Sequence, residues 1–164
     1  MKPFDDYPTD KDELLRPLGG PGNCRNGYGL DLQKRTGQTR CAYCGISLVD
    51  DYYHWLLMAA GHVVPTSAKL SLRMPSVLIE SLANRLLCCS GCNGFLNRYA
   101  VADEVPRDNW SLPDFIALRD RVFVDRKQKI GERRAAEMAI FDRKRWLDPQ
   151  KNGDRAGSHS ELRR

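Results

Sequence analysis

The chain has 164 residues, 41% of them hydrophobic, and a formal charge of +5 at pH 7. This length suits one compact domain with an appended arm or helix. No apolar run approaches the roughly 18 residues of a membrane span, and the acidic start, MKPFDDYPTD, lacks the apolar core of a secretory signal. These features argue against a membrane or exported protein and predict a cytoplasmic one.

The positive charge is unevenly distributed along the chain. Residues 1–104 hold 11 Lys and Arg against 11 Asp and Glu, whereas residues 105–164 hold 15 against 10. The pattern predicts a basic appendage on a neutral core, which suits a polyanionic partner such as DNA. A solvated helix face with a charged tail explains the same bias about equally well.

In chain order, residues 1–37 are expected to form an N-terminal arm, because prolines and glycines are frequent there. A first cysteine pair, CAYC, follows at Cys41 and Cys44. The aromatic and aliphatic residues 46–65 then predict a β-strand that stops at Pro65, because proline cannot donate a hydrogen bond to a sheet. This strand is expected to open the folded core.

The core is expected to continue to residue 104. Residues 66–83 predict a loop with a short helix after Pro75, and residues 84–89, NRLLCC, predict a second strand. Residues 92–104 predict a helix that opens at a second cysteine pair, CSGC. The expected order is therefore strand, loop, strand and helix.

The two CxxC pairs predict a tetrahedral zinc site. Two residues between the cysteines let the chain turn, so that both sulfurs reach one ion at about 2.3 Å. Disulfides are the alternative, but a chain without an export signal disfavours them. Cys88 is expected to be a buried strand residue, and Cys24 has no assigned role. The expected zinc ligands are Cys41, Cys44, Cys89 and Cys92.

Residues 105–148 predict a basic helical extension, because apolar residues recur there at helical spacing. The apolar side is expected to pack on the core. The basic side, which includes Arg126, Lys127 and Arg134, can follow a DNA backbone through phosphate contacts. Residues 149–164 are expected to be disordered. The apolar positions include Phe115, Leu118 and Val122.

Three polar side chains fall into the predicted core: His62 ends the first strand, Asn84 precedes the second, and Asn93 starts the helix. Together with the motifs CAYCG, HVVP and CSGCN and the asparagine of NRLLCC, they resemble the HNH endonuclease family over residues 38–100. The resemblance implies an α+β protein with a zinc-stabilised ββα-metal core. It also implies metal-dependent hydrolysis of phosphodiester bonds in DNA.

The resemblance assigns a role to each polar residue. The histidine matching His62 is the general base, and an ordinary pKa of about 6.5 suits that task. The asparagine matching Asn84 orients the imidazole or steadies its loop, and the residue matching Asn93 holds the catalytic Mg²⁺ or Mn²⁺. Each also has an ordinary structural interpretation, as a packed histidine, a turn residue or a helix cap. The candidate DNA contacts are Arg40, Arg98, Lys127 and Arg134.

Gly61 departs from the family pattern, which usually has Asp or Glu before the histidine as a ligand of the catalytic ion. Activity is lost, or a carboxylate comes from Asp50, Asp51 or Asp103, or substrate phosphate and water complete the coordination. The alternative function is therefore an inactive zinc-containing nucleic-acid-binding protein of the same fold. A protein-interaction module is a third possibility. If both strands are cut, a homodimer would ease the reaction.

Overall fold

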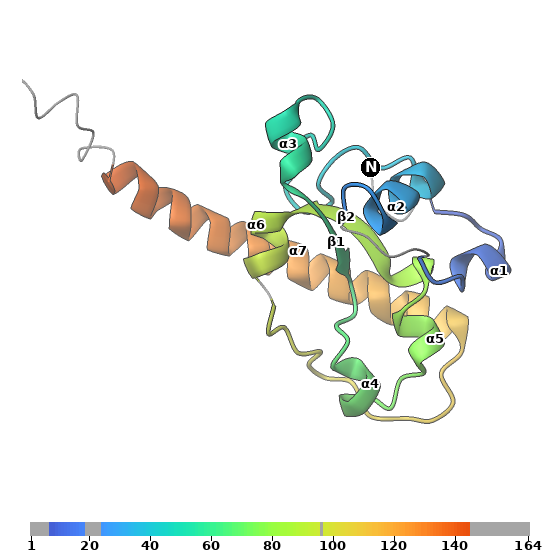
Figure 1. Cartoon of the computed structure of the whole chain (residues 1–164). Coiled ribbons are helices and arrows are strands. Elements are labelled where there is room, and N and C mark those ends of the chain that lie inside the picture. The colour runs from blue at the N-terminus through green and yellow to red at the C-terminus, as the bar shows by residue number, and fades with distance from the viewer. Residues whose placement is uncertain (1–6, 19–23, 96, 145–164) are drawn as a thin grey trace, which may run out of the picture. The chain divides into compact units, whose positions relative to one another are not determined.

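A computed structural model gives the structure of this chain and describes residues 7–18, 24–95 and 97–144. The protein is of the α+β type, with helices around a two-stranded antiparallel sheet (Figure 1). Within these ranges, every helix is too short or too polar to cross a membrane. The elements are α1 (Lys11–Leu14), α2 (Tyr28–Thr36), α3 (Tyr52–Leu56), β1 (Met58–His62), α4 (Ala68–Ser71), α5 (Ser76–Ile79), the 3₁₀-helix η1 (Leu82–Asn84), β2 (Arg85–Cys89), α6 (Ser90–Phe95) and α7 (Leu112–Lys144).

The chain divides into two units, Met1–Ile130 and Gly131–Arg164. The first unit contains the sheet and all elements up to residue 130 of α7. In the second unit, residues 131–144 are helical and exposed. The predicted disordered tail, residues 149–164, lies outside the described residues.

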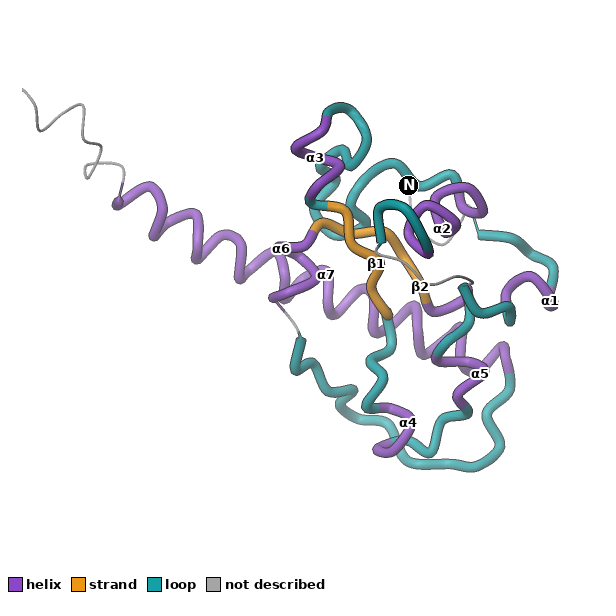
Figure 2. The backbone as a smooth tube through the Cα atoms, in the orientation of Figure 1, coloured by secondary structure: helices purple, strands orange, loops and turns teal. Residues whose placement is uncertain are grey.

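The sheet consists of β1 and β2, which lie side by side in Figure 2. Their register runs from Met58 opposite Cys89 to His62 opposite Arg85. An isolated pair of strands is only marginally stable in water. Here α2 and α6 both contact both strands, so packing against helices stabilises the pair.

The first strand is much shorter than the sequence predicts, because the prediction over residues 46–65 treated all its aromatic residues as strand. Residues 52–56 instead form α3, whose N-cap Asp51 accepts a hydrogen bond from the backbone N–H of His54 at 2.9 Å. Such a side-chain cap favours a helix start over a strand. Only residues 58–62 pair with β2.

The other predicted core elements are present. The short helix after Pro75 is α5, NRLLCC forms η1 and β2, and α6 begins at the second cysteine pair. However, α6 ends at Phe95 rather than near residue 104. Arg98 therefore lies in the turn after α6 and not on a helix.

Two helices outside the predicted strand–loop–strand–helix order complete the core. Leu32 of α2 is fully buried, although no helix was expected among residues 1–37. The apolar side of α7 packs on the core as predicted, and its buried residues are Phe115, Leu118, Val122, Phe123 and Ile130. Residues 112–130 of α7 are thus part of the first unit's core.

Candidate zinc centre and histidine site

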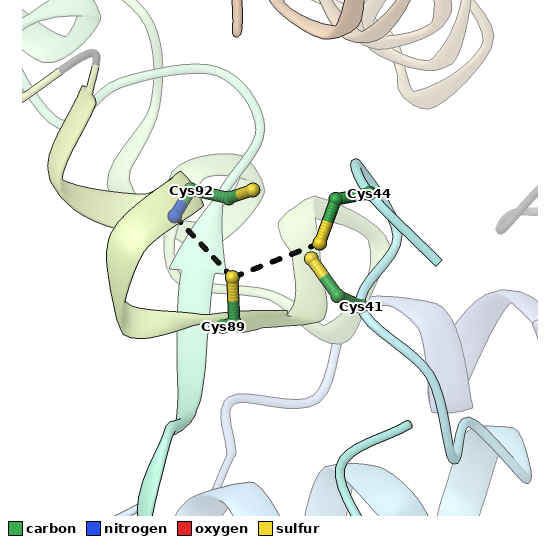
Figure 3. Close-up of side chains that lie close together, drawn as sticks. All are labelled: Cys41, Cys44, Cys89 and Cys92. Carbon is green, nitrogen blue, oxygen red and sulfur yellow. Dashed lines mark hydrogen bonds between the residues drawn. The ribbon is translucent and has the colours of Figure 1, made fainter. Parts of the chain in front are cut away.

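The four predicted zinc ligands form one cluster. Their sulfur atoms all lie within 4.8 Å of one another, and the side chains of the two pairs point toward each other (Figure 3). A tetrahedral zinc ion with bonds of about 2.3 Å requires sulfur atoms about 3.8 Å apart. The Sγ atoms of Cys44 and Cys89 are 3.8 Å apart. The cluster therefore fits a structural zinc ion.

Local backbone structure places the two cysteine pairs. The first pair lies in a tight turn in which the N–H of Gly45, with φ of 75°, donates to the carbonyl of Cys41 at 2.8 Å. A hydrogen bond of 3.0 Å from the N–H of Ala42 to the carbonyl of Leu87 holds this turn against β2. Sulfur–sulfur hydrogen bonds from the second pair lower the pKa of Cys41. A zinc ion bound by both pairs would join two segments that are far apart in sequence, the turn of the first pair and the junction of β2 and α6.

Cys88 is separate from the metal cluster. It is fully buried in β2, as expected, and burial raises the pKa of its thiol. The Sγ of Cys88 would lie 3.4 Å from a Cβ placed on Gly61. Cys88 therefore packs beside Gly61 of β1 as a neutral thiol.

His62 lies at the end of β1 in a group of charged side chains. Its Nε2 is 3.3 Å from Oε2 of Glu80, and this carboxylate also accepts hydrogen bonds from Lys69 at 2.5 Å and Arg85 at 2.6 Å. His62 and Arg85 are opposite each other in the sheet. Across the described residues, Nδ1 of His62 has no hydrogen-bond partner. This nitrogen is free to accept a proton when Nε2 carries the hydrogen.

The surroundings of His62 favour its neutral form. Burial lowers its pKa below the usual value, and the charge of Arg85 acts in the same direction. The hydrogen bond from Lys69 is the main cause that lowers the pKa of Glu80 to about 2. At neutral pH the pair is therefore a neutral imidazole beside an ionised carboxylate.

The carboxylate beside His62 is one that the sequence analysis missed. Of the carboxylates that the sequence suggested, Asp50, Asp51 and Asp103, Asp51 caps α3 and pairs with His54 at 2.8 Å. Asp103 lies in the loop after α6 with φ of 60°. Glu80 has no motif spacing to His62, so only the return of the loop to the sheet reveals it.

Asn93 lies in the first turn of α6 and faces Gly61. A Cβ on Gly61 would lie only 2.9 Å from Oδ1 of Asn93. Because successive side chains point to opposite faces of a strand, His62 points away from the face on which Gly61 meets α6. The structure thus brings Asn93 to Gly61, and it brings His62 to Glu80 on the other face.

Asn84 steadies the loop that follows β1. Its buried side chain accepts a hydrogen bond from the N–H of Val64 at 2.8 Å and donates to the carbonyls of Val64 and Ile79, both at 2.9 Å. These three bonds make the amide a bridge across the loop. Of the two expected roles, this geometry matches support of the loop.

Arg126 is buried, so the prediction that it lies on the basic, DNA-facing side of the helix is wrong. Its side chain is 5% exposed, and Nη1 donates to the carbonyls of His62 at 2.6 Å and Val63 at 2.7 Å. The guanidinium also lies 5.8 Å from the ring of Tyr43 and 5.3 Å from that of Tyr99. Arg126 therefore fixes the end of β1 to α7.

The four candidate DNA contacts, Arg40, Arg98, Lys127 and Arg134, are exposed. Arg40 and Lys127 both line a pocket of about 480 Å³ beside the first cysteine pair. Arg98 lies in the turn after α6, and Arg134 lies in the second unit. Arg40 and Lys127 thus share one surface of the first unit.

Comparison of the chain with protein-family models, curated proteins and solved structures finds no match. Function is therefore inferred from the residues and their geometry. Two groups of side chains bear on it. One is the four-cysteine cluster, and the other is the set of polar side chains around the end of β1.

Proposed function

We propose that this protein is a zinc-stabilised, HNH-type endonuclease that hydrolyses phosphodiester bonds in DNA with a divalent metal ion. One observation supports the proposal above all others. The chain forms β1, β2 and α6 in this order, with His62 at the end of β1 and Asn93 of α6 packed against the preceding residue. The four-cysteine cluster would join the turn of the first cysteine pair to the end of β2 and the start of α6.

In this proposal His62 is the general base. Glu80 holds Nε2, so that Nδ1 is the atom that takes a proton from the attacking water. A lowered pKa keeps the imidazole neutral and able to accept that proton at neutral pH. Arg126 and Asn84 hold the backbone of residues 62–64 in place.

The ligand set for Mg²⁺ or Mn²⁺ is poor. Mg²⁺ normally takes one or two carboxylates together with phosphate oxygens and water. Next to Gly61 the chain offers the amide oxygen of Asn93 in place of a carboxylate. These residues do not fit a firmly held ion, and we expect the free protein to bind Mg²⁺ weakly.

A second candidate function is a non-catalytic, zinc-containing nucleic-acid-binding protein of the same fold. The lack of a carboxylate at Gly61, beside Asn93, favours it. Arg40 and Lys127 would contact phosphates in either case. Only turnover distinguishes the two functions.

The experiment is cleavage of supercoiled plasmid by the zinc-loaded protein with Mg²⁺ or Mn²⁺. We expect the wild type to nick the plasmid and His62→Ala to lose activity. His54→Ala is the matched control, because His54 is a partly exposed histidine paired with Asp51 on α3. Gly61→Asp should raise the rate at low metal concentration. Plasmid binding without cleavage by the wild type would instead favour the second function.

A further inference from the structure

Three side chains from separate elements converge on the carboxylate of Glu80. Lys69 comes from α4, Arg85 from β2 and His62 from β1. We propose that Lys69 and Arg85 form a phosphate-binding subsite beside His62, and that Glu80 covers this subsite in the free protein. The proposal deepens the proposed function, because the phosphate belongs to the DNA strand to be cut.

The geometry around Glu80 is that of an oxyanion site. Oε1 accepts from Nζ of Lys69 at 2.5 Å, while Oε2 accepts from Nη2 of Arg85 at 2.6 Å and lies 3.3 Å from Nε2 of His62. Ammonium and guanidinium groups bind carboxylate and phosphate oxygens by the same charge-assisted hydrogen bonds. A phosphate can therefore take the place that the Glu80 carboxylate occupies.

The charge balance of the cluster leaves room for an anion. Lys69 and Arg85 carry two positive charges against the one negative charge of Glu80, since the surroundings favour neutral His62. The cations remain reachable from solvent, because the side chain of Lys69 is 33% exposed and that of Arg85 is 16% exposed. Partial burial also reduces the screening that weakens fully exposed ion pairs.

The subsite supplies positive charge at the phosphate. On the other face of β1, Gly61 offers no carboxylate to hold a metal ion that would supply such charge. Hydrolysis builds negative charge on the phosphate, and fixed cations aimed at that charge stabilise it. Lys69 and Arg85 provide such cations next to the general base without a carboxylate-held ion. Glu80 follows the four-residue α5 as its C-cap, with a side chain that is 37% exposed. Rotation of this side chain away from Lys69 and Arg85 would break its contacts with both cations.

The first test uses inorganic phosphate as the probe and the full-length, zinc-loaded protein. NMR signals of the His62 ring and of the Arg85 Nε–H are followed at constant ionic strength, with chloride replaced by phosphate. We expect saturable shifts in the wild type and about fivefold tighter binding in Glu80→Gln, since one partly exposed ion pair contributes at most about fivefold. Lys69→Gln should weaken binding about as much.

Glu104→Gln is the matched control. It removes the same charge from another glutamate that pairs with arginines, Arg107 and Arg121, and should leave phosphate affinity unchanged. Arg85→Gln is a second variant that is expected to bind phosphate more weakly. Lys69 lies outside the sheet, so Lys69→Gln is expected to keep the fold. Equal phosphate affinity in Glu80→Gln and the wild type, or shifts that never saturate, would overturn the proposal.

Plasmid cleavage separates failure of the subsite from failure of the nuclease. If the wild type never cleaves but Glu80→Gln binds phosphate more tightly, the subsite stands and the nuclease proposal fails. If the wild type cleaves and both Lys69→Gln and Arg85→Gln cleave as fast as the wild type, the subsite proposal fails and the nuclease proposal stands. A short DNA duplex in place of inorganic phosphate should give the same His62 shifts at lower concentration.

Discussion

Replacing Arg126 with Met should destabilise the first unit substantially. The side chain is 5% exposed and makes hydrogen bonds of 2.6 and 2.7 Å to two backbone carbonyls, those of His62 and Val63. Each hydrogen bond from a charged donor contributes about 1.5–3 kcal/mol. Methionine has a similar length but no donor, and it removes the cost of burying a charge. We therefore expect a net loss of about 2 kcal/mol rather than the full sum of the two bonds.

The assay is urea denaturation of the zinc-loaded protein, followed by circular dichroism, with thermal unfolding in parallel. A loss of about 2 kcal/mol should lower the melting temperature by about 5–10 °C in a unit of this size. Arg121→Met is the matched control on the same helix, because Arg121 is 67% exposed and pairs only at the surface with Glu104. It should change stability by less than about 0.5 kcal/mol. Equal stabilities of the two variants would refute the proposed role of Arg126 in holding the end of β1 against α7.

Three further predictions concern the cysteine cluster, His62 and Asn84. Chelation should release one zinc ion per chain and unfold the protein; Cys89→Ser should prevent zinc loading, measured by elemental analysis, whereas Cys88→Ala should not. Because the pKa of His62 is lowered in the fold, its stability contribution is fully present above about pH 6.5 and falls as the pH drops through the lowered pKa. The cleavage rate should fall as the pH drops below about 6.5. A fall that begins at a higher pH would contradict the role of His62 as general base. Asn84→Ala removes three buried hydrogen bonds and should cost about 2–3 kcal/mol in urea denaturation, so a change below about 0.5 kcal/mol would show that the loop is held otherwise.

The cysteine cluster was predictable because its spacing restricts the chain directly. Two residues between ligands allow one metal to be bound, whatever the rest of the fold does. The second strand was also predictable, since NRLLCC combines apolar residues with a bounded length. The first strand was not, because composition alone does not show that Asp51 caps a helix within the aromatic segment.

The sequence interpretation missed the roles of Glu80 and Arg126 for different reasons. Glu80 reaches His62 through the path of a loop, which no periodic pattern encodes. For Arg126 a signal did exist: it lies four residues after the buried Val122, as Arg119 lies four residues after the buried Phe115. Residues four apart share a helix face, so this spacing indicates that both arginines lie on the packed side of α7. Positive charge outweighed this spacing in the interpretation.

The placement of charge around β1 leads to a last prediction. Gly61 allows Asn93 to approach the strand, while the cations Lys69 and Arg85 lie on the face of His62. If these cations stabilise the same phosphate as a metal ion near Asn93, the two contributions are partly redundant. Gly61→Asp should then raise the cleavage rate by a larger factor in a Lys69→Gln background than in the wild type.

A double-mutant cycle measures this coupling directly, because it compares the effect of one change in the presence and absence of the other. Glu104→Gln serves as the background control, since Glu104 pairs with Arg107 and Arg121 away from Lys69. A larger gain only in the Lys69→Gln background would place both faces of β1 at one phosphate. Equal gains in all backgrounds would mean that the two faces act independently, and the cations would then bind a phosphate other than the one that is cut.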